Sequence, residues 1–91
     1  MWATMEDRER WIKAARRAHA TRILVVCDTF DYEQYPVYCR DAKEAEEKRK
    51  HYDGPNMQRV EDEIVVPKGN GSRVSKAAMR KAIVGTARHF A

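Results

Sequence analysis

The stretch RILVVCD, residues 22–28, decides the fold. Apolar side chains fill every position from Ile23 to Cys27, and several of them are β-branched. A strand with one face in water alternates apolar and polar residues, whereas a continuous apolar run predicts burial of both faces. We therefore expect a central strand here, with Val25 and Cys27 fully buried.

The segment YPVYCR, residues 35–40, predicts a second strand. Pro36 has no amide hydrogen, so this strand either begins at Pro36 or lies at the edge of a sheet. Residues 29–34 form too long a connection for a two-residue hairpin turn and suit a wider antiparallel loop.

The segment QRVEDEIVV, residues 58–66, predicts a third strand. Counting by two places Val60, Ile64 and Val66 on one face, with Asp62 as a polar exception on that face. If the first strand lies between the other two, both of its buried faces are covered.

Residues 4–19 predict a helix that has Thr4 as its N-cap and acidic residues in its first turn. One side is apolar and the opposite side is basic, although Arg8 intrudes on the apolar side. A second helix is expected to start after Asp41, an N-cap, and to end near Gly54.

Residues 72–90 predict a third helix, capped by Ser72 or Ser75. The resulting order is α-β-β-α-β-α. We expect an α+β fold with a small three-stranded mixed sheet of order 2-1-3, a right-handed β-α-β crossover and helices packed on the sheet.

Ninety-one residues predict one domain with a modest core. Within it we expect an N-terminal helix (1–20), a β-β-α-β core (21–66), and a linker with a basic helix (67–91). No apolar run approaches the roughly 18 residues of a membrane span, and the first residues lack the order of a secretory signal. We therefore expect a cytoplasmic protein without a membrane partner.

In that compartment Cys27 and Cys39 are expected to be free thiols, because the cytosol keeps thiols reduced. Two cysteines alone do not make a four-ligand zinc site. The three histidines fall near predicted helix C-termini, where the helix dipole favours imidazolium. They are His19, His51 and His89. No triad is indicated, so we expect neither an enzyme nor a cofactor.

The net charge of +4 is unevenly distributed along the chain. Positions 1–20 hold five basic and three acidic residues, and positions 21–66 hold seven basic and eleven acidic residues. Positions 67–91 hold six basic residues and no acidic ones. Such asymmetry indicates either a charged partner or attraction between the segments within the fold.

The acidic character is concentrated in DTFDYEQYPVYC, residues 28–39. A strand followed by Asp28, with Asp31 and Glu33 nearby, is similar to the start of CRISPR-associated ferredoxin-fold proteins and would imply a Mg²⁺ site. The chain departs from that family because a basic helix precedes the strand and a second strand follows it. We expect the aspartates to accept loop amide hydrogen bonds and predict no functional Mg²⁺ or Zn²⁺ site.

The segment YPVYCRDAKEAEEKRKHYDGPNMQRVEDEIVV, residues 35–66, resembles segments of small phage-encoded accessory proteins. The YPVY strand and the YDGPNMQRV turn carry the resemblance. It implies a protein of a phage or mobile element that binds and blocks host machinery, such as a CRISPR effector.

Two classes of function therefore compete. The first is a protein-binding inhibitor of a host protein or ribonucleoprotein, acting as a nucleic-acid mimic through an acidic, tyrosine-rich surface. Its expected contact residues are Asp31, Tyr32, Glu33, Tyr35 and Tyr38. The second is direct nucleic-acid binding by the basic terminal helices. The expected phosphate contacts of the C-terminal helix are Arg73, Lys76, Arg80, Lys81 and Arg88.

Overall fold

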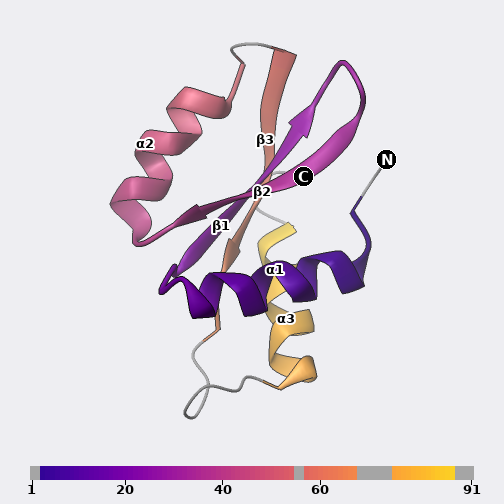
Figure 1. Ribbon diagram of the computed structural model, residues 1–91, viewed down its shortest axis with the longest axis vertical. Helices are drawn as coiled ribbons and strands as arrows, with labels where there is room; N and C mark the ends of the chain where they lie inside the picture. The colour runs from indigo at the N-terminus through magenta and orange to yellow at the C-terminus, as the bar shows by residue number, and fades with distance from the viewer. Residues whose placement is uncertain (1–2, 55–56, 68–74, 88–91) are drawn as a thin grey trace.

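The predicted element order is confirmed (Figure 1). A computed structural model describes residues 3–54, 57–67 and 75–87. The elements are α1 (Met5–Arg17), β1 (Arg22–Asp28), β2 (Glu33–Cys39), α2 (Ala42–Tyr52), β3 (Gln58–Val65) and α3 (Lys76–Ala87). None of the described helices is both long enough and apolar enough to span a membrane.

The sheet has the predicted order β2-β1-β3, with the first strand at its centre. Strand β1 runs antiparallel to both neighbours, so the expectation of a mixed sheet was wrong. Helix α2 does connect two strands that run in the same direction. These strands lie on either side of β1, however, so no parallel pair forms.

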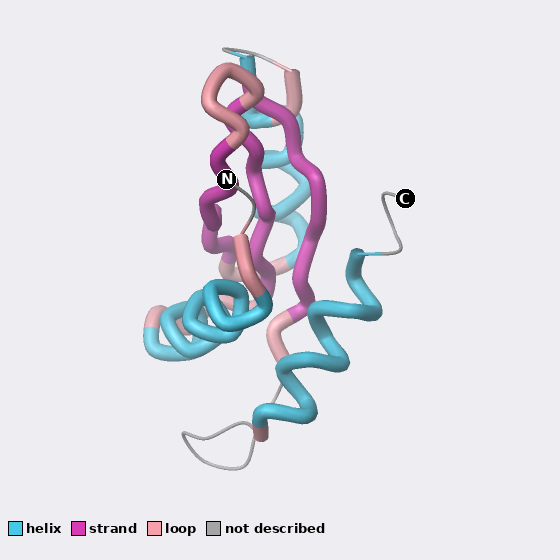
Figure 2. The backbone as a smooth tube through the Cα atoms, turned by 90° about the vertical axis from the view of Figure 1, so that its right-hand side faces the viewer, coloured by secondary structure: helices cyan, strands magenta, loops and turns pink. Residues whose placement is uncertain are grey.

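Both faces of β1 are buried, as its continuous apolar run predicts. Ile23 and Val25 pack under α1 and α3, whereas Leu24 and Val26 pack under α2. Figure 2 shows α1 and α3 in front of the sheet and α2 behind it. Cys27 and Val25 are fully buried, as expected.

A β-bulge in β3 overturns one expectation about the faces. The register of β3 against β1 shifts between Val25 and Val26, which leaves Glu61 as an extra residue. An extra residue turns all side chains beyond it to the opposite face. Val60 therefore packs under α2, whereas Ile64 and Val66 pack under α1 and α3.

The two polar exceptions in the predicted pattern, Arg8 and Asp62, bind each other. The bulge places Asp62 opposite Val25, on the face that α1 covers. The Nη1 atom of Arg8 lies 2.8 Å from Oδ2 of Asp62, and both side chains are largely buried. A charge buried with a partner is tolerated where an unpaired one would not be.

The expected helix caps are also confirmed. Thr4 and Asp7 form a reciprocal capping box, and the side chain of Asp41 accepts a hydrogen bond from the Glu44 amide at 2.8 Å. Ser75 caps α3 by accepting from the Ala78 amide at 3.1 Å. The alternative cap, Ser72, lies outside the described residues.

Contacts from α2 and the residues after it occupy parts of both sheet edges. On β2, Pro36 has no amide hydrogen, and Nζ of Lys48 donates to the carbonyl oxygen of Tyr38 at 2.9 Å. On β3, the Val60 amide donates to the Asp53 carboxylate at 3.1 Å. Each of these bonds occupies one backbone group of an edge strand, which removes that group from pairing with another strand.

Candidate interaction surface

The loop between β1 and β2 is fastened to the start of β3. The amide and the hydroxyl of Thr29 both donate to the carbonyl oxygen of Met57, at 2.8 and 2.7 Å. Within the loop, Oδ1 of Asp28 accepts from the Phe30 amide at 2.9 Å, and the Tyr32 amide donates to the Asp28 carbonyl at 2.6 Å. These bonds give the loop a defined shape.

That defined shape holds large apolar side chains in water. Phe30 is 72% exposed, Tyr32 58% and Met57 57%. Tyr32 and Met57 also share a φ of 59°, in the left-handed region that non-glycine residues seldom adopt. Conformations of this kind cost of order 1–3 kcal/mol and cluster at functional sites.

We call this part of the molecule the tip surface. It comprises Phe30, Asp31, Tyr32, Glu33 and Met57. The sequence had predicted Asp31, Tyr32 and Glu33 as contact residues, and it had not indicated Phe30 or Met57. Phe30 could have been found from the sequence, because it is a large apolar residue within a polar loop.

The acidic residues of the tip differ from those of β3. Arginines pair with Glu61, Asp62 and Glu63. Among the described residues, no ion pair reaches Asp31 or Glu33. Of these pairs, only Arg8 with Asp62 joins two of the segments defined by charge, because the arginines that pair with Glu61 and Glu63 also lie within residues 21–66.

Two of the predicted contact tyrosines lie away from the tip surface. Because side chains alternate along β2, Tyr35 packs on the α2 side of the sheet and Tyr38 on the α1 side. The hydroxyl of Tyr35 donates to the side chain of Gln58. The structure therefore places Asp31, Tyr32 and Glu33 in one exposed segment, at the end of the loop and the start of β2, whereas Tyr35 and Tyr38 are half-buried on opposite faces of the sheet.

The carboxylate of Asp28 serves the loop, as expected, by accepting from backbone amides. Over residues 3–54, 57–67 and 75–87, no three His, Cys, Asp or Glu side chains are grouped to hold a metal ion. The absence of a functional Mg²⁺ or Zn²⁺ site stays a prediction.

The two cysteines are free thiols and lie far apart in the sheet. Cys27 pairs with Gln34 near one end of the hairpin, and Cys39 pairs with Arg22 at the other. Burial raises the pKa of both thiols, and the Glu61 carboxylate raises that of Cys27 further. Both are therefore protonated at neutral pH, which makes them poor nucleophiles.

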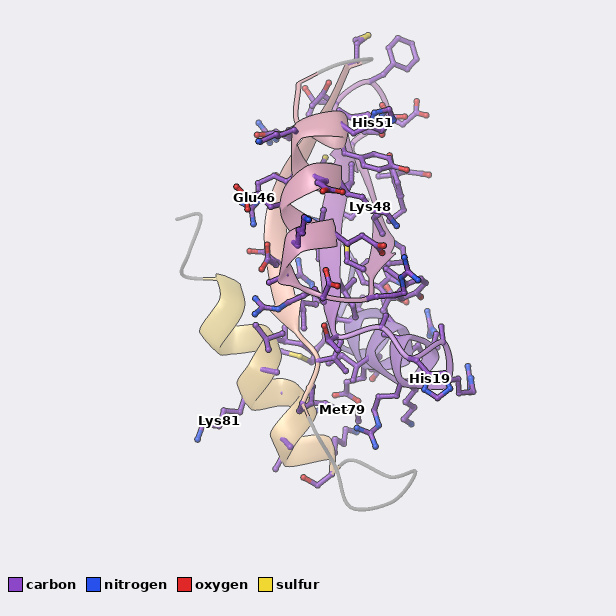
Figure 3. The ribbon with its side chains drawn as sticks, turned by 90° about the vertical axis from the view of Figure 1, so that its left-hand side faces the viewer. His19, Glu46, Lys48, His51, Met79 and Lys81 are labelled. Atoms are coloured by element: carbon purple, nitrogen blue, oxygen red, sulfur yellow. The ribbon has the colours of Figure 1, made fainter. Side chains whose placement is uncertain are left out.

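Three of the basic residues expected on the C-terminal helix are described, namely Lys76, Arg80 and Lys81, and all three are exposed. The Nε atom of Arg80 lies 2.9 Å from Oε1 of Glu9 on α1. Lys76 and Lys81 are exposed, and Figure 3 shows Lys81 pointing away from the sheet while Met79 points toward it. Arg73, Arg88 and His89 lie outside the described residues.

The other two histidines lie at helix ends. His51 is in the last turn of α2, as expected. His19 follows α1 with a φ of 59°, and the bonds from its amide to Arg16 and from Ala20 to Ala15 form a Schellman motif.

No protein-family model, curated protein or solved structure matches this chain. The resemblance of residues 35–66 to phage accessory proteins therefore stays a prediction.

Proposed function

We propose that this protein is a non-enzymatic protein-binding module and that the tip surface is its contact site. One observation carries the proposal: a hydrogen-bonded loop holds Phe30 and Tyr32 in water beside Met57. Full burial of such a side chain is worth about 1.5–3 kcal/mol. A partner that covers all three would gain most of its affinity there.

The order of the loop supports the same function. A flexible loop loses conformational entropy when it binds, which weakens the complex. The bonds from Thr29 to Met57 and from Phe30 to Asp28 already fix the backbone in the free protein. The aromatic side chains are thus presented on a preorganised support.

The charge of the tip surface defines the partner. Asp31 and Glu33 flank Tyr32 in the chain, and all three are exposed, so the complementary surface is an apolar pocket with a cationic rim. A protein that binds nucleic acid has such a rim, and carboxylates there occupy positions meant for phosphates. The proposed partner is a bacterial nucleic-acid-handling protein or ribonucleoprotein, a CRISPR effector being one example, and the proposed effect is inhibition.

Affinity capture from a nuclease-treated bacterial lysate tests the proposal. The informative variant is Phe30→Ser/Tyr32→Ser, and Lys76→Gln/Lys81→Gln is the control because it alters exposed residues on α3. We expect one set of proteins on the wild type and the control, and its loss from the tip variant. Unchanged capture by a folded tip variant would refute the proposal.

A further inference from the structure

A second charged surface lies at the end of the sheet opposite the tip. It is formed where the end of α1 meets the end of β2, and the hydroxyl of Thr21 donates to the Arg40 carbonyl at 2.7 Å across this junction. We call it the cationic end surface. It comprises the exposed residues Lys13, Arg17, His19 and Arg40, of which Arg40 forms an ion pair with Glu44 at 3.2 Å.

Lys13 and Arg17 form a repulsive pair. They are four residues apart on α1, which places them on the same side of the helix, where like charges destabilise it by about 0.2–0.5 kcal/mol. Arg10 pairs with Asp7 and Lys48 pairs with Glu44, whereas Glu9, four residues before Lys13, pairs with Arg80 on α3. Among the described residues, no carboxylate forms an ion pair with Lys13 or Arg17.

The helix dipole explains only part of this arrangement. Arg17 is in the last turn of α1, where the negative end of the dipole favours a cation. Lys13 lies one turn earlier, and the effect is confined to the last turn. A bound anion would offset the remaining repulsion.

An aromatic residue lies beside these cations. Tyr38 is half-buried on the edge strand β2. Burial raises the pKa of its hydroxyl, and the nearby Arg17 guanidinium lowers it by a smaller amount. Partly exposed aromatic rings next to cations are the recurring elements of sites for single-stranded nucleic acids, in which bases stack and phosphates are neutralised.

The acidic tip does not oppose phosphate binding at this position. The hairpin pairs Asp28 with Glu33 at the tip and Arg22 with Cys39 at the other end, so its two ends are about 20 Å apart at 3.4 Å per residue. Screening reduces interactions between exposed charges beyond about 8–10 Å. In Figure 1, α1 crosses the sheet at the end away from the loop that carries the tip, and Figure 3 shows His19 pointing outward there.

We propose that the cationic end surface binds the phosphate backbone of single-stranded nucleic acid without reading its sequence. This site lies on α1 and the end of β2, not on the C-terminal helix, and it does not depend on the function of the tip. A protein with both sites would hold a partner protein and a nucleic-acid strand at opposite ends of one hairpin.

Fluorescence anisotropy with a labelled oligothymidylate of about 16 nucleotides tests this inference. The variant Lys13→Gln/Arg17→Gln is compared with Lys43→Gln/Lys50→Gln, which removes two exposed charges from α2. Between about 50 and 200 mM salt, loss of two phosphate contacts should reduce the slope of log K against log salt by about 1.4. The α2 control should keep the wild-type slope.

Three results would overturn the inference. They are the absence of salt-dependent binding by the wild type, a loss of slope in the α2 control equal to that in the α1 variant, and tighter binding of a duplex of equal length than of the single strand. The variant Asp31→Asn/Glu33→Gln separates this site from the tip. It should bind the oligonucleotide at least as well as the wild type, and weaker binding would place the contact at the tip.

Discussion

At the scale of single residues, the ion pair of Arg8 and Asp62 connects two anomalies of the sequence. Each is a charged residue on an otherwise apolar face, and each lies beside the other in the fold. Gln34 adds a neutral contact, since its Oε1 lies 3.5 Å from the Arg8 guanidinium. A buried ion pair can therefore be predicted where one charged residue lies on the apolar side of a helix and an opposite charge lies on the apolar face of a strand.

Removal of one charge of the ion pair between Arg8 and Asp62 should lower the free energy of unfolding more than removal of both charges. Arg8→Met leaves the Asp62 carboxylate buried without its cation, which is expected to cost about 3–5 kcal/mol of unfolding free energy. The double variant Arg8→Met/Asp62→Val should recover most of that loss, because its side chains fit the neighbouring apolar core. Urea unfolding of the single and double variants measures the coupling. Additive losses would show that the two charges act independently.

His19 carries a separable conformational cost. Its φ of 59° is favourable for glycine and strained for residues with a Cβ. His19→Gly should therefore stabilise the protein by about 0.5–1 kcal/mol in thermal or urea unfolding. The matched control is His51→Gly in the last turn of α2, where glycine should not stabilise. Destabilisation by His19→Gly would mean that the imidazole makes a contact that outweighs the strain.

At the scale of elements, β1 determines which other elements can pack. Val25→Asp places an unpaired charge between two helix-covered faces, and this cost exceeds what a domain with about 5–15 kcal/mol of stability can absorb. We expect Val25→Asp to abolish cooperative thermal unfolding. Val65→Asp, at an exposed position on β3, should still melt cooperatively. A cooperatively melting Val25→Asp variant would contradict the central position of β1.

The burial of the two cysteines predicts how fast their thiols react. Cys27 and Cys39 are buried in β1 and β2, and burial raises the pKa of each. Both should react slowly with a disulfide reagent in the native protein and rapidly in denaturant, because the thiolate is the reactive form. Rapid modification of the native protein would indicate that one of these strands opens.

The element order, the strand order and the caps could be predicted because each depends on local sequence. The continuous run from Ile23 to Cys27 is sufficient to place β1 at the centre. The faces of β3 could not be predicted, because a bulge at Glu61 is decided by pairing with β1. For the tip, sequence composition indicated Asp31 and Glu33, but the exposure of Met57 depends on a tertiary contact with Thr29.

At the scale of the whole molecule, the charge asymmetry of the chain becomes a spatial polarity. Pairs such as Arg8 with Asp62 and Arg80 with Glu9 neutralise charge across the α1 side of the sheet. Asp31 and Glu33 remain without an ion pair at the hairpin loop, and Lys13 and Arg17 remain so near the end of α1, among the described residues. This polarity gives the two proposed sites opposite charge and separates them along the hairpin.

The central claim is that the tip surface is the contact site for a basic protein partner. The most direct measurement is the association rate of the captured partner at low salt, with Asp31→Asn/Glu33→Gln compared with Lys76→Gln/Lys81→Gln. Because electrostatic attraction accelerates encounter, loss of the two carboxylates should slow association by roughly tenfold and weaken its salt dependence. The lysine variant should associate at the wild-type rate. Unchanged association by the carboxylate variant, together with loss of association by the lysine variant, would contradict the claim.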